Sequence, residues 1–325
     1  MDTEIYEKEY LIKVRREFLK MQKEKINTSL QIEKKESFVG YCEAELVDNY
    51  NGVTFPMSVM YPTDEAGRIE ELGPFSLDLS INAKPKDGQF PLIVISHGSG
   101  GGNLLYRTLA HHLASHGFIV AIPEHPFNNF NNNTLEGTVE NLENRPRHIY
   151  TAIDWFLENE KFAGVLKANS ISIIGHSTGG ITALSVAGGI PTSLPNESLD
   201  GQPKQINVAH DRKIKSLVLL APGTVWFREK GALSGVDIPI LMITAEKDQF
   251  IQPFHAQIVL DGVADSSKVE HKIVENAGHF SFLSPFPEFM VTPEFFPAQD
   301  PAGFDREQFH NKLNIEILDF LMKVK

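Results

Sequence analysis

The residues best suited to chemistry lie in the run GHSTGG at positions 175–180. An apolar, strand-like segment at 171–174 precedes this run, and a helical pattern follows it. A serine at a sharp turn from strand to helix is the G-x-S-x-G arrangement of a nucleophile, because the strained turn holds the hydroxyl clear of the backbone. The glycines leave room where strand and helix approach each other. The pattern predicts Ser177 as the nucleophile, and the alternative is a glycine-rich turn with an idle serine.

A base and an acid follow Ser177 along the chain. Asp248 comes after the apolar segment 238–244, and His279 comes after the last such segment, 268–275. The order Ser, Asp, His is the one used with an elbow of this kind. We expect His279 to take the serine proton and Asp248 to hold the imidazole in the required tautomer. Glu246, in the same turn as Asp248, is the alternative acid.

A second glycine-rich turn, SHGSGGG at 96–102, follows the apolar segment 91–96. Such a turn presents backbone N–H groups without obstruction, and we assign the N–H groups of Ser99 and Thr178 as donors to an oxyanion. A turn of this kind also suits phosphate binding, but neither G-x-x-x-x-G-K-[ST] nor G-x-G-x-x-G is present. His97 is expected to shape the turn rather than to act as a base.

These candidates require a frame of alternating strands and helices. We expect strands at 37–48, 53–63, 91–96, 118–123, 170–174, 214–221, 238–244 and 268–275, and helices at 103–116, 145–159, 179–188, 252–261 and 306–323. The polar segment 64–89 reads as a surface loop. Continuous apolar runs are typical of parallel strands that helices cover on both faces. The sequence therefore predicts an α/β fold with a mixed, mostly parallel, eight-stranded sheet flanked by helices.

The chain divides into a short N-terminal segment and a large domain. Apolar residues recur at helical spacing through 3–35, so residues 1–36 are expected to form an extra amphipathic helix. This helix either packs on the domain or serves as a lid or a homodimer contact. Residues 37–325 form the predicted catalytic domain, with loop insertions at 189–212 and 284–304. Loops of this length are often functional.

Composition narrows the classes of partner. The 30 basic and 42 acidic residues leave a formal charge of −12, which disfavours nucleic acid as a partner. Cys42, the single cysteine, allows no internal disulfide. The chain shows no apolar signal segment and no apolar run long enough to span a bilayer, so we expect a cytoplasmic protein without a membrane span. We also expect no metal and no cofactor, because no ligand set or dinucleotide fingerprint is present.

These motifs together resemble the α/β-hydrolase superfamily, in particular the dienelactone-hydrolase-like group and the platelet-activating-factor acetylhydrolases. The resemblance covers roughly residues 37–325 and rests on the two glycine-rich turns, on AEKD at 245–248 and on GHF at 278–280. It implies the α/β-hydrolase fold and ester hydrolysis through an acyl-enzyme, with Ser177, Asp248 and His279 as the triad. Two features differ from the group. The acid follows a later strand than in the acetylhydrolases, and serine replaces the cysteine of dienelactone hydrolases.

Polar and aromatic residues are expected to line the substrate pocket. The candidates, taken from the segments around the motifs, are His97, Glu124, His125, Phe127, His176, Trp226, Phe280 and Phe282. The aromatic members favour a small-molecule ester with an apolar acyl or aromatic group. The same apparatus suits an amidase, peptidase, thioesterase or acyltransferase acting on a peptide or secondary metabolite. A further alternative is an interaction protein that keeps the fold without turnover.

Overall fold

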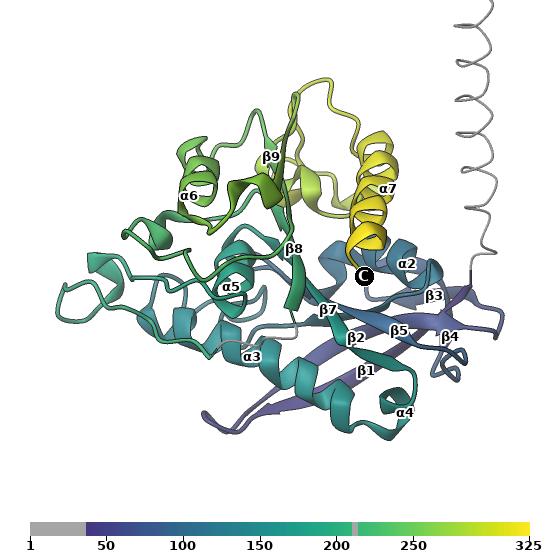
Figure 1. Ribbon diagram of the computed structural model, residues 1–325. Coiled ribbons are helices and arrows are strands. Elements are labelled where there is room, and N and C mark those ends of the chain that lie inside the picture. Colours follow the sequence, from purple (N-terminus) through teal and green to yellow (C-terminus); the bar gives the residue numbers. More distant parts are fainter. Residues whose placement is uncertain (1–36, 210–213) are drawn as a thin grey trace, which may run out of the picture. The chain divides into compact units, whose positions relative to one another are not determined.

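The computed structural model describes residues 37–209 and 214–325 (Figure 1). Residues Ser37–Lys325 form one compact unit. The amphipathic helix expected at 3–35, and the lid or dimer contact suggested for it, lie outside the described residues. The same holds for the end of the insertion expected at 189–212.

A ten-stranded sheet forms the centre of the domain, in the order β10-β9-β8-β7-β5-β6-β2-β1-β4-β3. Five neighbouring pairs, from β10 to β6, are parallel, whereas β2 is antiparallel to β6 and to β1. The strands are β1 (Phe38–Asp48), β2 (Val53–Thr63), β3 (Arg68–Leu72), β4 (Phe75–Ile81), β5 (Phe90–Ser96), β6 (Ile119–Pro123), β7 (Leu166–His176), β8 (Ile214–Leu220), β9 (Ile240–Ala245) and β10 (Val269–Val274).

Helices cover both faces of this sheet (Figure 1). In β5, Leu92 and Val94 face one core and Ile93 and Ile95 face the other, which explains why the strand reads as a continuous apolar run. The α-helices are α2 (Arg107–Ser115), α3 (Val139–Glu158), α4 (Glu160–Ala163), α5 (Thr178–Val186), α6 (Phe254–Gly262) and α7 (Arg306–Val324). Helices α3, α5 and α6 pack on the first core, and α2 and α7 on the second.

The sheet has two strands more than expected, because β3 and β4 lie within the segment 64–89 that was predicted as a loop. Their hairpin packs by one face only: Phe75, Leu77 and Leu79 of β4 are buried, while the residues between them are more exposed. Strand β3 is short, mostly charged and at the edge of the sheet. A charged edge strand carries little apolar periodicity, so the prediction of a loop was wrong.

The sequence predicted that this helix begins at residue 145, but α3 begins at Val139. The Thr138 side chain caps it by accepting a hydrogen bond from the Asn141 backbone N–H. Pro146 therefore lies inside the helix, although proline is commoner in the first turn. None of the helices within residues 37–209 and 214–325 is long and apolar enough to span a membrane.

The hairpin gives a direct test of this architecture. Leu79 is completely buried, whereas Ile69 of β3 is 68% exposed. We expect Leu79→Ala to lower the free energy of unfolding by about 2–5 kcal/mol, because it leaves a cavity in the core. The matched change Ile69→Ala should stay within about 0.5 kcal/mol. Urea unfolding of both variants measures the difference, and equal losses would contradict the packing of β4 against the core.

Candidate active site

Ser177 stands at the turn between β7 and α5 in a backbone conformation rarely adopted by serine, with φ 55° and ψ −119°. The surrounding chain holds this conformation in place. The Ser177 N–H donates to the Leu220 carbonyl over 3.0 Å, and its carbonyl accepts from the N–H groups of Gly180 and Gly223, each over 2.9 Å. The strained residue is thus fixed by hydrogen bonds from its own helix and from the end of β8.

The glycines of the elbow are required by close approach rather than by backbone angle. A Cβ atom on Gly175 would lie 2.2 Å from the Gly179 carbonyl oxygen, and one on Gly179 would lie 1.9 Å from the Ser96 carbonyl oxygen. Neither contact is sterically possible. The first turn of α5 therefore packs directly on the backbone that ends β5, where the second glycine-rich turn begins.

Three distant side chains meet in one line of hydrogen bonds. His279 Nε2 lies 3.0 Å from Ser177 Oγ, and His279 Nδ1 lies 2.8 Å from Asp248 Oδ2. The other oxygen, Asp248 Oδ1, accepts from the N–H groups of Phe250 and Ile251, each over 2.8 Å. The carboxylate is therefore fixed on both sides, and it fixes the ring that faces the hydroxyl.

The electrostatics suit a charged carboxylate at this position. Burial by itself would raise the pKa of Asp248, but the hydrogen bond and the charge of His279, together with the two backbone N–H groups, outweigh it and lower the pKa. Asp248 is thus ionised at neutral pH and can stabilise a positive imidazolium.

The alternative acid, Glu246, does not contact the His279 ring. Glu246 is exposed, and its Oε2 accepts from the Asn276 N–H over 2.8 Å. Asn276 has a φ of 57° and precedes His279 by three residues. Glu246 therefore braces the turn that carries the histidine, whereas Asp248 contacts the ring itself.

The two backbone N–H groups expected to bind an oxyanion, those of Ser99 and Thr178, belong to the two glycine-rich turns. Thr178 is the first residue of α5, where helical N–H groups have no partner within the helix. A Cβ on Gly98 would lie 3.2 Å from the Ser177 Cβ, so the turn that carries Ser99 approaches the serine closely. Within residues 37–209 and 214–325, the N–H groups of Ser99 and Thr178 donate to no acceptor. Both are free to bind a ligand oxygen.

The Ser99 side chain is tied to a loop that the sequence motifs did not single out. Its Oγ donates to Glu136 Oε1 over 2.7 Å and accepts from Asn128 Nδ2 over 2.9 Å. Asn128 Nδ2 also donates to Asn133 Oδ1 over 2.7 Å. The asparagine-rich run at 128–133 was the available signal, but its contact with Ser99 depends on chain segments that are far apart in sequence.

Four of the expected pocket residues lie in the interior. The exposed fractions of His97, His125, His176 and Phe282 are between 0% and 2%. His176 joins Tyr106 Oη, 2.9 Å from its Nδ1, to the His279 carbonyl, 3.1 Å from its Nε2. His97 Nδ1 lies 2.7 Å from the Gly98 carbonyl oxygen, and His97 Nε2 accepts from the His125 N–H. The burial of these four replaces the expectation of substrate contact: the three histidines hold the turns, and Phe282 packs on the His176 ring.

The other four expected pocket residues, Glu124, Phe127, Trp226 and Phe280, are half-buried. Burial raises the pKa of Glu124, which lies beside Gly102. The Trp226 ring lies beside Gly223, and its Nε1–H donates to Glu197 Oε2 over 2.8 Å. Glu197 belongs to the irregular segment 189–209, so that segment sets the position of an aromatic ring near the elbow.

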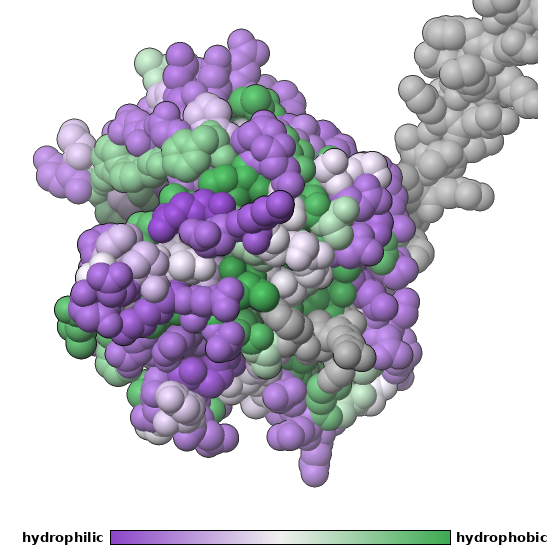
Figure 2. Space-filling model, turned by 60° about the vertical axis from the view of Figure 1, so that its left-hand side comes forward, coloured by the Kyte–Doolittle hydropathy of each residue, from purple (hydrophilic) through white to green (hydrophobic). Residues whose placement is uncertain are grey.

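A cavity of about 440 Å³ opens beside His279. The rings of Phe250, Phe280 and Phe296 meet edge to face around it, and Phe250 and Phe296 are about half exposed. Figure 2 shows that apolar groups reach the surface between polar ones on the face of the molecule it presents. The cavity is lined by Lys247, Gln249, Phe250, Gly278, His279, Phe280, Phe296, Gln299, Asp300 and Pro301. Its aromatic wall suits an apolar or aromatic group.

The strand order and the strand–turn–helix elbow define the α/β-hydrolase fold, and solved structures share it. A ferulic acid esterase from Streptomyces cinnamoneus superposes with a TM-score of 0.63, with 16% identity and coverage of 90% of this chain and 91% of that one. A dienelactone-hydrolase-like promiscuous phosphotriesterase from metagenomic libraries gives a TM-score of 0.57, with 12% identity and coverage of 88% and 99%. The chain therefore has the α/β-hydrolase fold, as the sequence predicted.

Sequence comparisons match parts of the chain. The Chlorophyllase family model matches residues 68–199, which include both glycine-rich turns and end before Asp248 and His279. The platelet-activating factor acetylhydrolase of Cavia porcellus is 31% identical over a stretch that covers 32% of this chain and 33% of that protein. The chain thus spans about a third of the length of this curated relative.

The buried histidines make stability depend on pH. Burial lowers the pKa of His176 to about 3, from 6.5 for an exposed imidazole. The unfolded chain therefore takes up the proton first as the pH falls, and the stability present above pH 6.5 is lost as the pH falls towards 3. We expect His176→Gln to make the fall in unfolding free energy shallower by up to about 1.4 kcal/mol per pH unit. Urea unfolding between about pH 6 and pH 4 measures this slope, and identical slopes would refute the assignment.

Proposed function

We propose that the protein is a serine hydrolase that cleaves a carboxylic ester through an acyl-enzyme intermediate. The observation that carries the proposal is the line of hydrogen bonds from Asp248 through His279 to Ser177 Oγ, at 2.8 and 3.0 Å. This arrangement activates a hydroxyl that is otherwise a weak nucleophile. The elbow adds the free N–H of Thr178 directly beside that hydroxyl.

The geometry supports the following cycle. Ser177 Oγ attacks the ester carbonyl while His279 Nε2 takes its proton, and Asp248 stabilises the resulting imidazolium. The N–H groups of Ser99 and Thr178 bind the oxyanion that forms. His279 then protonates the leaving alcohol, and in the second half of the cycle it activates the water that releases the acid.

The aromatic cavity suggests where the alcohol portion of the ester binds. Because His279 must deliver its proton to the leaving oxygen, the leaving group has to lie on the side of this ring. Phe250 and Phe280 both contact the ring, with centroids 5.1 Å away, and both line the cavity. We therefore place an apolar or aromatic leaving group there, and the acyl group towards Trp226.

The comparisons support ester cleavage but do not identify the ester that this chain cleaves. An acetylhydrolase and a ferulic acid esterase are among the proteins that this chain resembles. The cytoplasmic location, the absence of a nucleic-acid partner and a homodimer formed through residues 1–36 stay predictions.

The proposed nucleophile is tested by removing its hydroxyl. Ser177→Ala should fold normally and lose at least about 10³-fold in turnover of p-nitrophenyl esters, because it removes the hydroxyl that the mechanism acylates. Ser185→Ala is a matched control in helix α5, which begins directly after Ser177. The buried Ser185 hydroxyl has no hydrogen-bond partner among the described residues, and its removal should leave turnover unchanged. A fluorophosphonate probe should label the native protein on Ser177. The absence of this adduct in folded protein would favour a non-catalytic interaction role.

The class of bond is tested with paired substrates. We expect p-nitrophenyl and naphthyl esters to be cleaved faster than the matching anilides and thioesters. Preferred cleavage of the anilides would indicate an amidase or peptidase instead, and acyl transfer to added alcohols in preference to water would indicate an acyltransferase.

A second pair of variants identifies the acid. Asp248→Asn should lower kcat by roughly 10⁴-fold, because an amide neither stabilises the imidazolium nor holds the correct tautomer. Glu246→Gln removes a carboxylate from the same turn without touching His279, so its kcat should stay within a few-fold of the native value. Steady-state kinetics on one ester decides between them. A larger loss of kcat in Glu246→Gln than in Asp248→Asn would indicate that Glu246 is the acid and Asp248 is not.

A further inference from the structure

Helix α3 carries a guanidinium into the interior of the domain. Arg145 is 1% exposed, and no carboxylate of the described residues forms an ion pair with it. Burial lowers the pKa of Arg145 to about 9, so it is still positively charged at neutral pH. Placing an unpaired charge in the interior is costly, and it is tolerated only where hydrogen bonds surround it.

Neutral acceptors from three segments surround this charge. Arg145 Nη1 donates to Asn128 Oδ1 over 2.6 Å, and Nε donates to Thr182 Oγ1 over 3.1 Å. Nη2 donates to the His97 carbonyl oxygen and to Ser96 Oγ. One side chain therefore ties together the end of β5, the loop after β6 and helix α5.

Each of these contacts leads to a proposed oxyanion donor. The His97 carbonyl lies two residues before the Ser99 N–H. Thr182 lies one helical turn after Thr178, and its hydroxyl also reaches the Thr178 carbonyl at 3.4 Å. Because Asn128 accepts from Arg145 through Oδ1, its Nδ2 points to Ser99 Oγ, 2.9 Å away. The guanidinium thus constrains Ser99 by two routes. It bonds the backbone two residues earlier, at His97, and it bonds Asn128, which in turn bonds the Ser99 hydroxyl.

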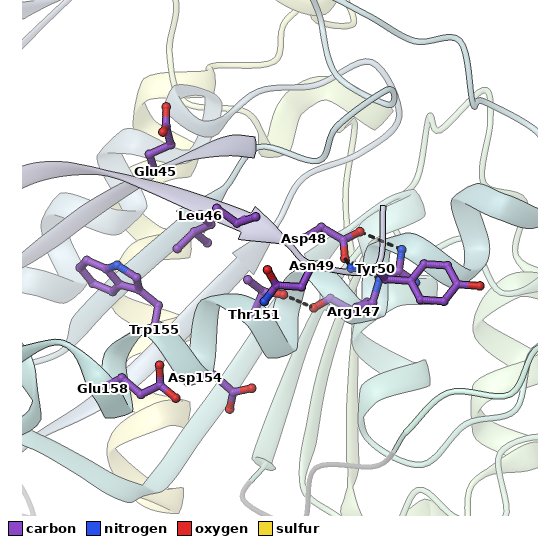
Figure 3. Close-up of a pocket in the computed structure, with 11 residues that line it drawn as sticks. Glu45, Leu46, Asp48, Asn49, Tyr50, Arg147, Thr151, Asp154, Trp155 and Glu158 are labelled. Atoms are coloured by element: carbon purple, nitrogen blue, oxygen red, sulfur yellow. Dashed lines mark hydrogen bonds and ion pairs between the residues drawn. The ribbon is translucent and has the colours of Figure 1, made fainter. Parts of the chain in front are cut away.

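A neighbouring arginine shows that the helix alone does not dictate this placement. Arg147, two residues further along α3, points to a surface pocket and pairs with Asp48 through two hydrogen bonds of 2.8 and 2.9 Å (Figure 3). Arg147 therefore has an ordinary ion pair, while Arg145 has only uncharged partners that belong to the turns around the elbow.

We propose that Arg145 is a positioning residue of the oxyanion hole. It fixes the backbone of residues 97–99 against helix α5 at Thr182, and so sets the separation of the Ser99 and Thr178 N–H groups. The inference rests on the proposed hydrolase function. It predicts a defect in the transition state rather than in substrate binding, because the oxyanion exists only after attack.

The test compares the same change at two positions of α3 in the full-length protein. Arg145→Met should lower kcat for a p-nitrophenyl ester by about 100-fold, with KM within about threefold, because a displaced donor loses most of its effect. Arg147→Met also removes a guanidinium with buried partners, and its kcat should stay within about threefold of the native value. Circular dichroism and urea unfolding report whether both variants fold.

Two further variants keep the test decisive if Arg145→Met does not fold. Asn128→Asp keeps the acceptor for Arg145 but removes the donor to Ser99 Oγ, and we expect a fall in kcat of about 10-fold or more at similar KM. Arg145→Lys keeps the charge but cannot reach three segments at once, so it should restore only part of the kcat lost in Arg145→Met.

The last measurement separates positioning from general destabilisation. Affinity for a trifluoromethyl ketone, whose adduct with Ser177 places an oxyanion in the hole, should fall in parallel with kcat/KM across the variants. Unchanged kcat in folded Arg145→Met or, if that variant is unfolded, in Asn128→Asp would overturn the inference. Such a result would leave the proposed function intact, which fails instead if the native protein forms no fluorophosphonate adduct on Ser177.

Discussion

A single close approach, between the first turn of α5 and the backbone that ends β5, sets the geometry of the whole site. Gly179 packs so tightly on the Ser96 carbonyl that no side chain fits between them. This contact brings the two glycine-rich turns together beside Ser177, which has a strained backbone conformation at φ 55°. Such a conformation persists only when surrounding structure over-determines it, and here the hydrogen bonds from Leu220, Gly180 and Gly223 do so.

Several polar side chains are buried behind this contact. His97, His125 and His176 are buried, and their pKa values are lowered, so they are neutral hydrogen-bonding groups at neutral pH. Arg145 stands among them as a charged centre with uncharged partners. Neutral imidazoles and one guanidinium can each bond several backbone and side-chain groups. They therefore suit a region where loops, rather than regular elements, must be held in register.

Part of the wall around the candidate site comes from less regular chain. Glu197 in segment 189–209 holds Trp226, and Phe296 in segment 284–304 completes the aromatic cavity beside His279. The sheet and its helices thus position the proposed catalytic groups, while the long irregular segments supply part of the walls around them. This division allows the walls to vary without disturbing the elbow.

The sequence alone determined the strand–helix alternation, the α/β-hydrolase fold and the residues proposed for chemistry, because these depend on local patterns: continuous apolar runs, glycine-rich turns and chain order. It did not reveal the β3–β4 hairpin, whose one-sided packing leaves a weak pattern, or the buried state of His97, His125 and His176. Only the tertiary structure decided that Asp248 and not Glu246 contacts His279, and that Arg145, Asn128 and Ser99 form one connected group. Those facts depend on contacts between segments tens of residues apart, and no spacing within a single segment encodes them.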